Sequence, residues 1–320
     1  MMLISIINGV RVQQYINSVF PQCCTETRKT CGGSSDLITG MFSISNISWS
    51  WTLALVLVIL LSLVAPQTSN NRVRYYACYF CYVLNVSVIC TLLVPFFVFR
   101  PKNLENLTIC GKVMKHLTKF IGITWTLRNG HILEKRRGAV ITANHQSVFD
   151  ILGLFNIWET VGLCTVVTKK LLLYAPGLGQ VGWLGGLVFI DRNQPEAALQ
   201  AVLDSSHLIH DLKAKLWIFA EGTRNRNRGE LLPFKKGAFK SAVHFQAPII
   251  PVVFSPYYFI DGPHKTFNRG EIIISVLDEV STEGLKPEDS NELKKKVHDL
   301  MSAEFLKLKR EIETKYLSGS

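Results

Sequence analysis

Two long uncharged segments stand out in the first hundred residues of the chain. Residues 47–65 are almost wholly apolar, with two tryptophans near the start. They are long enough to cross the hydrocarbon core of a bilayer, with the aromatic rings at its interface. Residues 75–99 form a second uncharged run, which Asn85 and Pro95 interrupt. The pattern predicts two membrane helices. For the second, the alternative is a helix that lies in the membrane plane or packs on the following domain.

Two such helices would form a membrane hairpin over residues 45–100, preceded by an N-terminal extension of unknown role over residues 1–44. A hairpin leaves both of its ends on one side of the membrane. Basic residues that follow the second segment favour the cytosolic side, whereas Arg72 and Arg74 in the short linker favour the opposite orientation. Residues 101–320 form the third predicted part of the chain.

After residue 100, short apolar runs alternate with amphipathic segments. The runs predict strands at 123–127, 140–143, 163–167, 187–190, 216–219, 249–253 and 272–277. Helices are predicted between and after them, at 149–157, 195–213 and 292–312. Residues 106–122, before the first strand, are predicted to form a basic helix or an interface segment. Strands that alternate with helices predict an α/β domain with a mostly parallel sheet flanked by helices, in which ligands bind beyond the carboxyl ends of the strands.

The charge of the chain narrows the choice of partners. The sequence carries 35 Lys and Arg against 24 Asp and Glu, a net charge of +11, and most of the excess lies after residue 99. Such a charge favours anionic partners. The sequence has no aromatic-basic RNA motif and no zinc-finger spacing, so nucleic acid is not an expected partner. Anionic lipid or a phosphorylated substrate fits better beside two apolar segments.

The cysteines and histidines predict neither a disulfide framework nor a metal site. Cys23, Cys24 and Cys31 are clustered, but no histidine or second cysteine pair completes a zinc pattern. His207 and His210 lie three residues apart on a predicted helix without other ligands nearby. We therefore interpret both histidines as surface residues.

The stretch from Asn144 to Asp150 places a histidine and a carboxylate next to a predicted strand. His145 follows the buried run that ends at Ala143, and Asp150 comes five residues later. Positions i and i+5 of one helix lie about 140° apart, so the two side chains can meet only if the chain turns between them. Ser147 supplies such a turn, since Ser-x-x-Asp before an apolar run is a helix-start signature.

A histidine held by a carboxylate can act as a general base near neutral pH, because the carboxylate fixes the tautomer of the ring. No Gly-x-Ser-x-Gly nucleophile motif occurs near this stretch. Its absence argues against a serine hydrolase and favours direct transfer to a substrate hydroxyl. The alternative is that Ser147 and Asp150 only cap a helix, and that His145 is an ordinary loop residue.

Four segments together resemble the glycerophospholipid acyltransferase family. Residues 144–150 resemble its His-x4-Asp box, and the second, third and fourth motifs are matched by residues 186–192, 219–225 and 250–253. Gln146 suits the lysophosphatidic acid acyltransferase branch of that family. The resemblance runs from about residue 45 to about residue 300, whereas residues 1–40 match nothing in the family.

This resemblance implies an enzyme that transfers a fatty acyl group from acyl-CoA to the sn-2 hydroxyl of lysophosphatidic acid. The product would be phosphatidic acid, for phospholipid and triacylglycerol synthesis. The resemblance also implies acyl-CoA as co-substrate with no cofactor and no metal, and a multi-pass protein of the endoplasmic reticulum membrane. Another lysophospholipid or glycerol 3-phosphate is the alternative acceptor. A catalytically silent lipid-binding scaffold is the alternative of a different class, which the intact His145 and Asp150 pair disfavours.

The implied catalytic roles agree with the chemistry of a thioester. His145 would take the proton from the acceptor hydroxyl, and Asp150 would hold the imidazole and stabilise its charge. The developing oxyanion needs hydrogen-bond donors, for which backbone amides near Gly186 or at the helix start are candidates.

The predicted substrate-binding residues all follow predicted strands or open the next helix. They are Glu221, Gly222, Thr223, Arg224, Arg192 and Lys236. Arg224 is the expected phosphate clamp, because its planar fork matches phosphate oxygens, and Glu221 is expected to orient it. Arg192 and Lys236 are secondary phosphate candidates. The alternative for the Arg224 segment is a surface turn with an ordinary ion pair.

Overall fold

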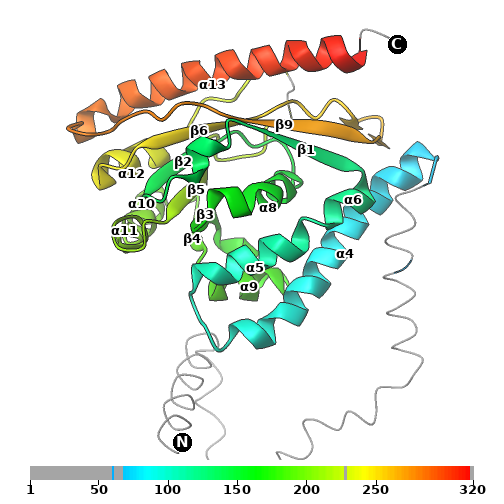
Figure 1. The fold of residues 1–320 in the computed structure, drawn as a ribbon, viewed down its shortest axis with the longest axis horizontal. Helices are drawn as coiled ribbons and strands as arrows, with labels where there is room; N and C mark the ends of the chain where they lie inside the picture. The colour runs from blue at the N-terminus through cyan, green and yellow to red at the C-terminus, as the bar shows by residue number, and fades with distance from the viewer. Residues whose placement is uncertain (1–59, 61–67, 227–228, 318–320) are drawn as a thin grey trace, which may run out of the picture. The chain divides into compact units, whose positions relative to one another are not determined.

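The structure is a computed structural model that describes residue 60 and residues 68–226 and 229–317 (Figure 1). The predicted N-terminal extension and nearly all of the first apolar segment, residues 47–65, therefore lie outside the described residues. Both remain predictions.

A seven-stranded sheet forms the centre of the described part, with the order β1-β9-β6-β2-β5-β3-β4. Its strands are β1 (Ile123–Arg128), β2 (Ala139–Ala143), β3 (Cys164–Lys169), β4 (Val188–Ile190), β5 (Lys215–Phe219), β6 (Ile249–Phe254) and β9 (Gly270–Val276). Five of the six neighbouring pairs are parallel, and only β6 and β9 pair antiparallel. The predicted fold class, a mostly parallel α/β sheet flanked by helices, is confirmed.

Helices cover both faces of this sheet, which separates two hydrophobic cores (Figure 1). On one face lie α5 (Leu104–Met114), α8 (Asp150–Val161) and α9 (Leu178–Leu184). On the other lie α10 (Pro195–Leu203), α11 (Ser206–His210), α12 (Gly237–Phe245) and α13 (Ser290–Ile312). Successive residues of β2 alternate between the two cores, Val140 in one and Ile141 in the other, as side chains of a strand must.

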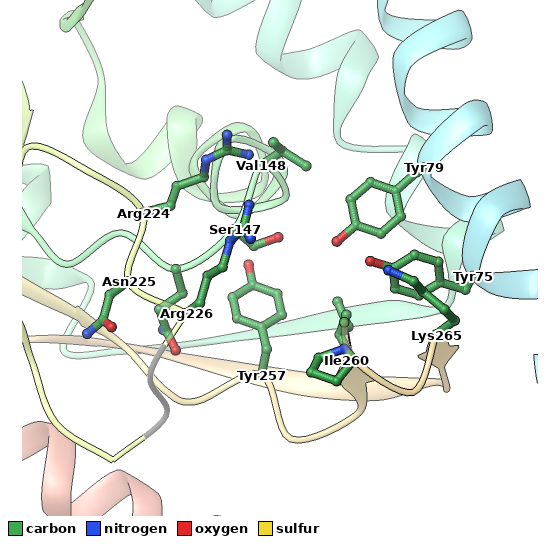
Figure 2. A pocket seen from close by; sticks show the side chains of 13 residues that line it. Tyr75, Tyr79, Ser147, Val148, Arg224, Asn225, Arg226, Tyr257, Ile260 and Lys265 are labelled. Carbon is green, nitrogen blue, oxygen red and sulfur yellow. The ribbon is translucent and has the colours of Figure 1, made fainter. Parts of the chain in front are cut away.

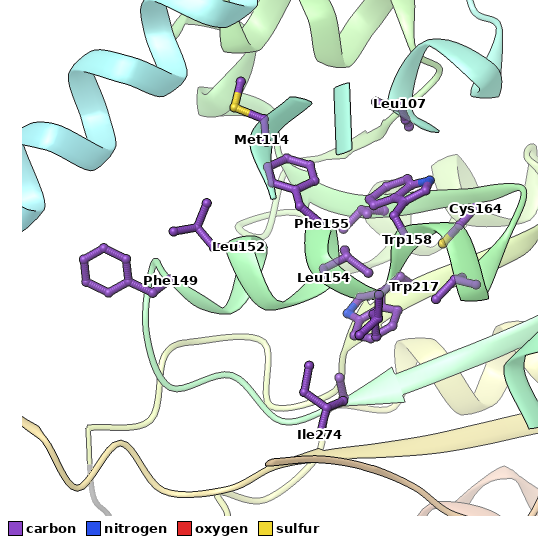
Figure 3. Packing of buried hydrophobic residues seen from close by; sticks show 14 of the residues in the cluster. Leu107, Met114, Phe149, Leu152, Leu154, Phe155, Trp158, Cys164, Trp217 and Ile274 are labelled. Carbon is purple, nitrogen blue, oxygen red and sulfur yellow. The ribbon is translucent and has the colours of Figure 1, made fainter. Parts of the chain in front are cut away.

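Helix α8 fixes the end of the predicted catalytic segment, residues 144–150, because large side chains bury the helix against the sheet. Phe149 and Trp158 are almost fully buried, and they pack in the same cluster as Trp217 of β5 and Ile274 of β9 (Figure 3). Burial of each such side chain contributes roughly 1.5–3 kcal/mol. The first turn of α8 is therefore held firmly at the carboxyl edge of the strands.

Two predicted helices are each divided in the structure. The segment 106–122 forms α5 and a separate short helix α6 (Leu117–Ile121), and the segment 195–213 forms α10 and α11. At the second break the Ser205 hydroxyl donates to the Val202 carbonyl at 2.5 Å. Such local side-chain bonds compete with continued helix, and apolar periodicity alone does not reveal them.

The second apolar segment forms a single helix, α4 (Asn71–Phe97), which contains Pro95. It contacts α5, α6, α9 and a small hairpin of β7 (Ile260–Asp261) and β8 (Thr266–Phe267). By length and composition α4 is long and apolar enough to cross a membrane, and no other described helix is. Its position against the domain agrees with the alternative prediction for this segment, a helix that packs on the following domain.

The placement of Arg72 and Arg74 in a linker is wrong, because both residues lie in the first turns of α4. The two differ in exposure, since Arg72 is exposed and Arg74 is buried. The Arg74 side chain donates from Nε to the Phe267 carbonyl at 2.6 Å and from Nη2 to the Ile121 carbonyl at 3.0 Å. Arg74 thus joins α4 to two segments of the domain. It cannot serve as an exposed charge that orients a membrane hairpin.

Candidate active site

In the loop after β2, side chains continue to point alternately in opposite directions, and two of them form hydrogen bonds with the end of β6. The buried Asn144 side chain donates to the Phe254 carbonyl at 3.0 Å and accepts the Phe254 N–H at 2.8 Å. Gln146 Nε2 donates to the carbonyls of Phe254 and Ser255, at 3.1 and 3.0 Å. The residues on both sides of His145 are therefore anchored, and Gln146 uses its amide for this purpose.

His145 points away from these anchors. Its ring stacks on Phe219 at the end of β5, with ring centroids 4.2 Å apart. Its Nδ1 lies 2.7 Å from Asp150 Oδ2, and the Asp150 side chain is completely buried. The same carboxylate oxygen accepts the backbone N–H groups of Gln146 at 2.7 Å and Ser147 at 3.0 Å. The chain thus turns at Ser147 and brings the two side chains together.

This geometry leaves His145 Nε2 as the free ring nitrogen, since no described residue makes a hydrogen bond to it. With Nδ1 bonded to the carboxylate, the other nitrogen is the acceptor of the neutral ring. A partly exposed imidazole held in this way is arranged to accept a proton from a bound hydroxyl.

Glu221 supports His145 from the opposite side. Its carboxyl group is 1% exposed, and it accepts the backbone N–H of His145 at 3.0 Å and that of Leu232 at 3.1 Å. Asn225 N–H donates to the His145 carbonyl at 2.6 Å. Each carboxylate oxygen of Glu221 therefore accepts a backbone N–H group. The structure thus gives Glu221 the role of supporting the backbone, in place of the expected role of orienting Arg224. Burial raises the pKa of Glu221 to about 7.

Arg192 lies beneath the turn that Glu221 begins. Its Nη1 donates to the Gly222 carbonyl, and burial lowers the pKa of its guanidinium. Gly222 has φ of +68°, and a Cβ there would lie 2.9 Å from Lys235 Cγ, so the turn needs glycine both for its conformation and for the close approach. Arg192 therefore holds the turn that presents Thr223, which is exposed.

A cavity of about 610 Å³ opens beside the His145 loop. Besides this loop, three other parts of the chain surround the cavity (Figure 2). Helix α4 contributes Tyr75 and Tyr79, the segment after β5 contributes Arg224 and Arg226, and the segment after β6 contributes Tyr257 and Lys265. Lys236, by contrast, is exposed at the start of α12 and does not line this cavity.

The cavity has a strong positive character. No acidic side chain is among its lining residues, and within the described ranges Arg224, Arg226 and Lys265 make no salt bridge. Lys265 Nζ instead lies over the Tyr75 ring, 5.4 Å from its centroid. Sequence reasoning missed Lys265, Tyr75 and Tyr79. The one signal for Tyr75 and Tyr79 was the run of tyrosines at the start of the apolar segment, whereas Lys265 had none.

Most candidate oxyanion donors are already engaged. The Gly186 N–H donates to the Trp183 carbonyl at 3.1 Å, and the amides of Gln146 and Ser147 donate to Asp150. The Val148 N–H is the amide of this turn without a hydrogen-bond partner in the described structure, and Val148 lines the cavity.

The fold and this pair of side chains define an acyltransferase. The family model described as Acyltransferase matches residues 124–255, a range that includes the His145 loop, the Gly222 turn and β6. A crystal structure of the 1-acyl-sn-glycerophosphate (LPA) acyltransferase PlsC from Thermotoga maritima has the same fold. It matches with a TM-score of 0.54 and 21% identity over 80% of this chain and 97% of that chain.

Curated relatives identify the family more closely. Bovine 1-acyl-sn-glycerol-3-phosphate acyltransferase alpha is 36% identical over 224 residues, which cover 70% of this chain and 76% of the relative. The human beta enzyme is 34% identical over 259 residues, 81% of this chain and 92% of the relative. The chain belongs to the 1-acyl-sn-glycerol-3-phosphate acyltransferase family, which confirms the resemblance of its four motifs.

Proposed function

We propose that this enzyme transfers a fatty acyl group from acyl-CoA to the sn-2 hydroxyl of lysophosphatidic acid, forming phosphatidic acid and free coenzyme A. The observation that carries the proposal is the His145–Asp150 pair, with Nδ1 and Oδ2 2.7 Å apart, beside a cavity lined by three cations that make no salt bridge with any described residue. The names of the relatives support the acceptor. The products would enter phospholipid and triacylglycerol synthesis.

In the proposed reaction His145 Nε2 takes the proton of the acceptor hydroxyl as its oxygen attacks the thioester carbonyl carbon. Asp150 holds the ring and stabilises the imidazolium that forms. Collapse of the tetrahedral intermediate breaks the carbon–sulfur bond, and the imidazolium returns the proton to the leaving thiolate. General-base assistance of this kind contributes about 10²–10⁴-fold in rate. The reaction needs acyl-CoA as co-substrate and no resident cofactor.

The Val148 N–H, which has no hydrogen-bond partner among the described residues, is the proposed donor to the oxyanion. A backbone donor aimed at the charge that develops in the transition state stabilises it more than it stabilises the substrate. Val148 lies within five residues of both His145 and Asp150, on the wall of the cavity. The amides that hold Asp150 would then fix the catalytic pair, while the next amide in the turn serves the substrate.

The three cations support a phosphorylated acceptor. A phosphate monoester carries about −1.5 to −2 charges at neutral pH, and the arginine fork can bind two of its oxygens. Arg224 is the proposed main ligand, with Arg226 and Lys265 completing the positive wall. Thr223 is exposed beside Arg224 and is not among the residues that line the cavity.

The wall that α4 provides supports a lipid as acceptor. Tyr75 and Tyr79 face the cavity, while Tyr76, Phe80 and Val83 on the same helix are more than half exposed. Exposed apolar side chains grouped on one helix mark a surface for a membrane or a partner. We propose that α4 meets the bilayer and that the acyl chain of the acceptor leaves the cavity along it. A multi-pass arrangement in the endoplasmic reticulum remains a prediction.

The proposal is tested with purified full-length protein, labelled acyl-CoA and a panel of acceptors. The panel holds lysophosphatidic acid, other lysophospholipids, glycerol 3-phosphate and monoacylglycerol, and products are separated by chromatography. We expect phosphatidic acid as the main product, with none from the His145→Ala variant. Preferential acylation of another acceptor would overturn the assigned substrate, and equal activity of His145→Ala would overturn the mechanism.

A further inference from the structure

The two oxygens of the Asp150 carboxylate have different surroundings. Oδ2 receives three hydrogen bonds, from the His145 ring and from two backbone amides. Oδ1 is buried and has no hydrogen-bond partner in the described part of the chain. A buried carboxylate oxygen without a partner is rare, because nothing replaces the water that it loses on folding.

A second unpartnered group lies beside this one. Tyr257 is 4% exposed, and its hydroxyl also has no hydrogen-bond partner among the described residues. Burial first, and then the nearby Asp150 carboxylate, raise the pKa of Tyr257 well above its usual range. Tyr82 of α4 adds a smaller effect of the same sign. The hydroxyl therefore stays protonated next to a group that can only accept.

The tyrosine ring is fixed by its neighbours. Its centroid lies 6.5 Å from that of Trp125 and 5.8 Å from that of Phe259. Tyr257 follows β6, to whose end Gln146 is anchored, and Figure 2 shows its hydroxyl pointing toward Ser147. The donor and the catalytic loop are thus held by the same strand end.

We infer that Tyr257 is a positioning residue, whose hydroxyl donates a hydrogen bond to Asp150 Oδ1 and fixes the plane of the carboxylate against His145. A phenol is a donor and a carboxylate oxygen is an acceptor, so one bond satisfies both buried groups. With both oxygens held, the carboxylate cannot rotate away from the imidazole. The inference rests on the proposed general-base role of His145 and adds a third member to that pair.

The bond also has an electrostatic effect. A donor on Oδ1 draws negative charge from Oδ2, so the imidazolium next to Oδ2 is less strongly stabilised. Removal of the hydroxyl leaves more charge on Oδ2, and His145 then holds a proton to higher pH. The other ionisable groups near this pair are Tyr79 and Tyr82 on α4 and Glu221 after β5, and the change at Tyr257 leaves all three in place.

The first test compares Tyr257→Phe with Tyr258→Phe. The control makes the same change at the next residue, whose hydroxyl accepts the Glu271 N–H at 3.3 Å and whose ring stacks on Tyr316. We expect Tyr257→Phe to lower kcat about tenfold, with both KM values unchanged. A tenfold loss corresponds to the lower end of the range for a hydrogen bond to a charged group. The acid limb of its pH profile should move to higher pH. An unchanged kcat and pH profile would overturn the inference.

A second measurement does not depend on turnover or on the substrate. In protein labelled with ¹⁵N-histidine, the Nδ1–H resonance of His145 is assigned by its loss in His145→Ala. We expect this resonance to shift in Tyr257→Phe and to stay in place in Tyr258→Phe. Replacement of Tyr257 by 3-fluorotyrosine, a stronger donor, should shift it in the opposite direction. An identical resonance in the wild type, Tyr257→Phe and the 3-fluorotyrosine protein would exclude the hydrogen bond, even if the assigned substrate were wrong.

Discussion

The Glu221 carboxylate accepts the backbone N–H of His145 at 3.0 Å, so one acidic side chain joins the segment after β5 to the segment after β2. Its second oxygen accepts the Leu232 N–H at 3.1 Å. A carboxylate that satisfies two buried backbone donors stabilises both segments. The acid of the Glu-Gly-Thr-Arg motif is therefore a structural support of the base and does not need to touch substrate.

Glu221 should make the stability of the enzyme depend on pH. Burial raises the pKa of its carboxyl group from an ordinary value near 4.5 to about 7. The folded state therefore holds this proton more tightly, and stability from this group is complete below about pH 4.5 and is lost as the pH rises through 7. The loss is about 3 kcal/mol at most. In Glu221→Gln, apparent Tm should fall less between pH 5 and 8 than in the wild type, and parallel curves would contradict this.

Substitution of the catalytic pair should stop the chemistry without unfolding the protein. His145→Ala removes the base and Asp150→Asn removes the carboxylate that holds it, so each should lower kcat by about 10²–10⁴-fold. His207→Ala, a change of an exposed histidine on α11, is the control and should keep normal kcat. Apparent Tm values close to wild type would show that the folds persist. A His145→Ala enzyme with near-normal turnover would remove the proposed mechanism.

The sequence was sufficient for the sheet and for the contact between His145 and Asp150, because both depend on local pattern. Buried strands are apolar runs, and the turn between His145 and Asp150 follows from the Ser-x-x-Asp spacing. The partner of Glu221 is a backbone amide, which has no side-chain signature. Lys265 and Tyr75 meet only through the tertiary fold, since they are 190 positions apart in the chain. Periodicity within a segment carries no information on such pairs.

Arg74 illustrates a second limit. A basic residue next to an apolar segment is typical of a charge that flanks a membrane helix. Only the structure shows that the Arg74 guanidinium donates to two backbone carbonyls. Composition cannot separate a helix that packs on a domain from one that crosses a bilayer. The two differ in what surrounds the helix, which its own residues do not specify.

Arg192 should act through the Gly222 turn and not by contact with phosphate. Arg192→Gln removes the hydrogen bond to the Gly222 carbonyl, so the turn that presents Arg224 becomes less well placed for every acceptor. We expect kcat/KM to fall by similar factors for lysophosphatidic acid and for neutral monoacylglycerol. A loss confined to the phosphorylated acceptor would instead make Arg192 a direct phosphate ligand.

Attachment to membranes tests the predicted span at 47–65 together with α4. Membranes that contain the full-length protein are washed with high salt and then with alkaline carbonate. We expect the protein to stay with the lipid in both, because apolar segments of this length are held by the hydrocarbon core. Release of intact protein by carbonate would show that neither segment is embedded.

Arg224 should determine the preference for a phosphorylated acceptor. Arg224→Lys keeps the charge but loses the planar fork. A charge-assisted hydrogen bond contributes about 1.5–3 kcal/mol, so kcat/KM for lysophosphatidic acid should fall roughly tenfold to a hundredfold. The loss should lie in its KM and not in the KM for acyl-CoA. Steady-state kinetics with each substrate varied in turn would measure the two separately.

Two matched lysine variants complete this test. Lys265→Gln removes a cation from the cavity wall, and Lys236→Gln removes an exposed cation outside it. Lys265 also contacts the Tyr75 ring, so the first change should raise the KM for lysophosphatidic acid, though less than Arg224→Lys, while the second should leave it unchanged. If instead the KM for acyl-CoA rose in Arg224→Lys and Lys265→Gln, these cations would bind the coenzyme's phosphates. The acceptor phosphate would then lie elsewhere on the rim, with Lys236 the first candidate.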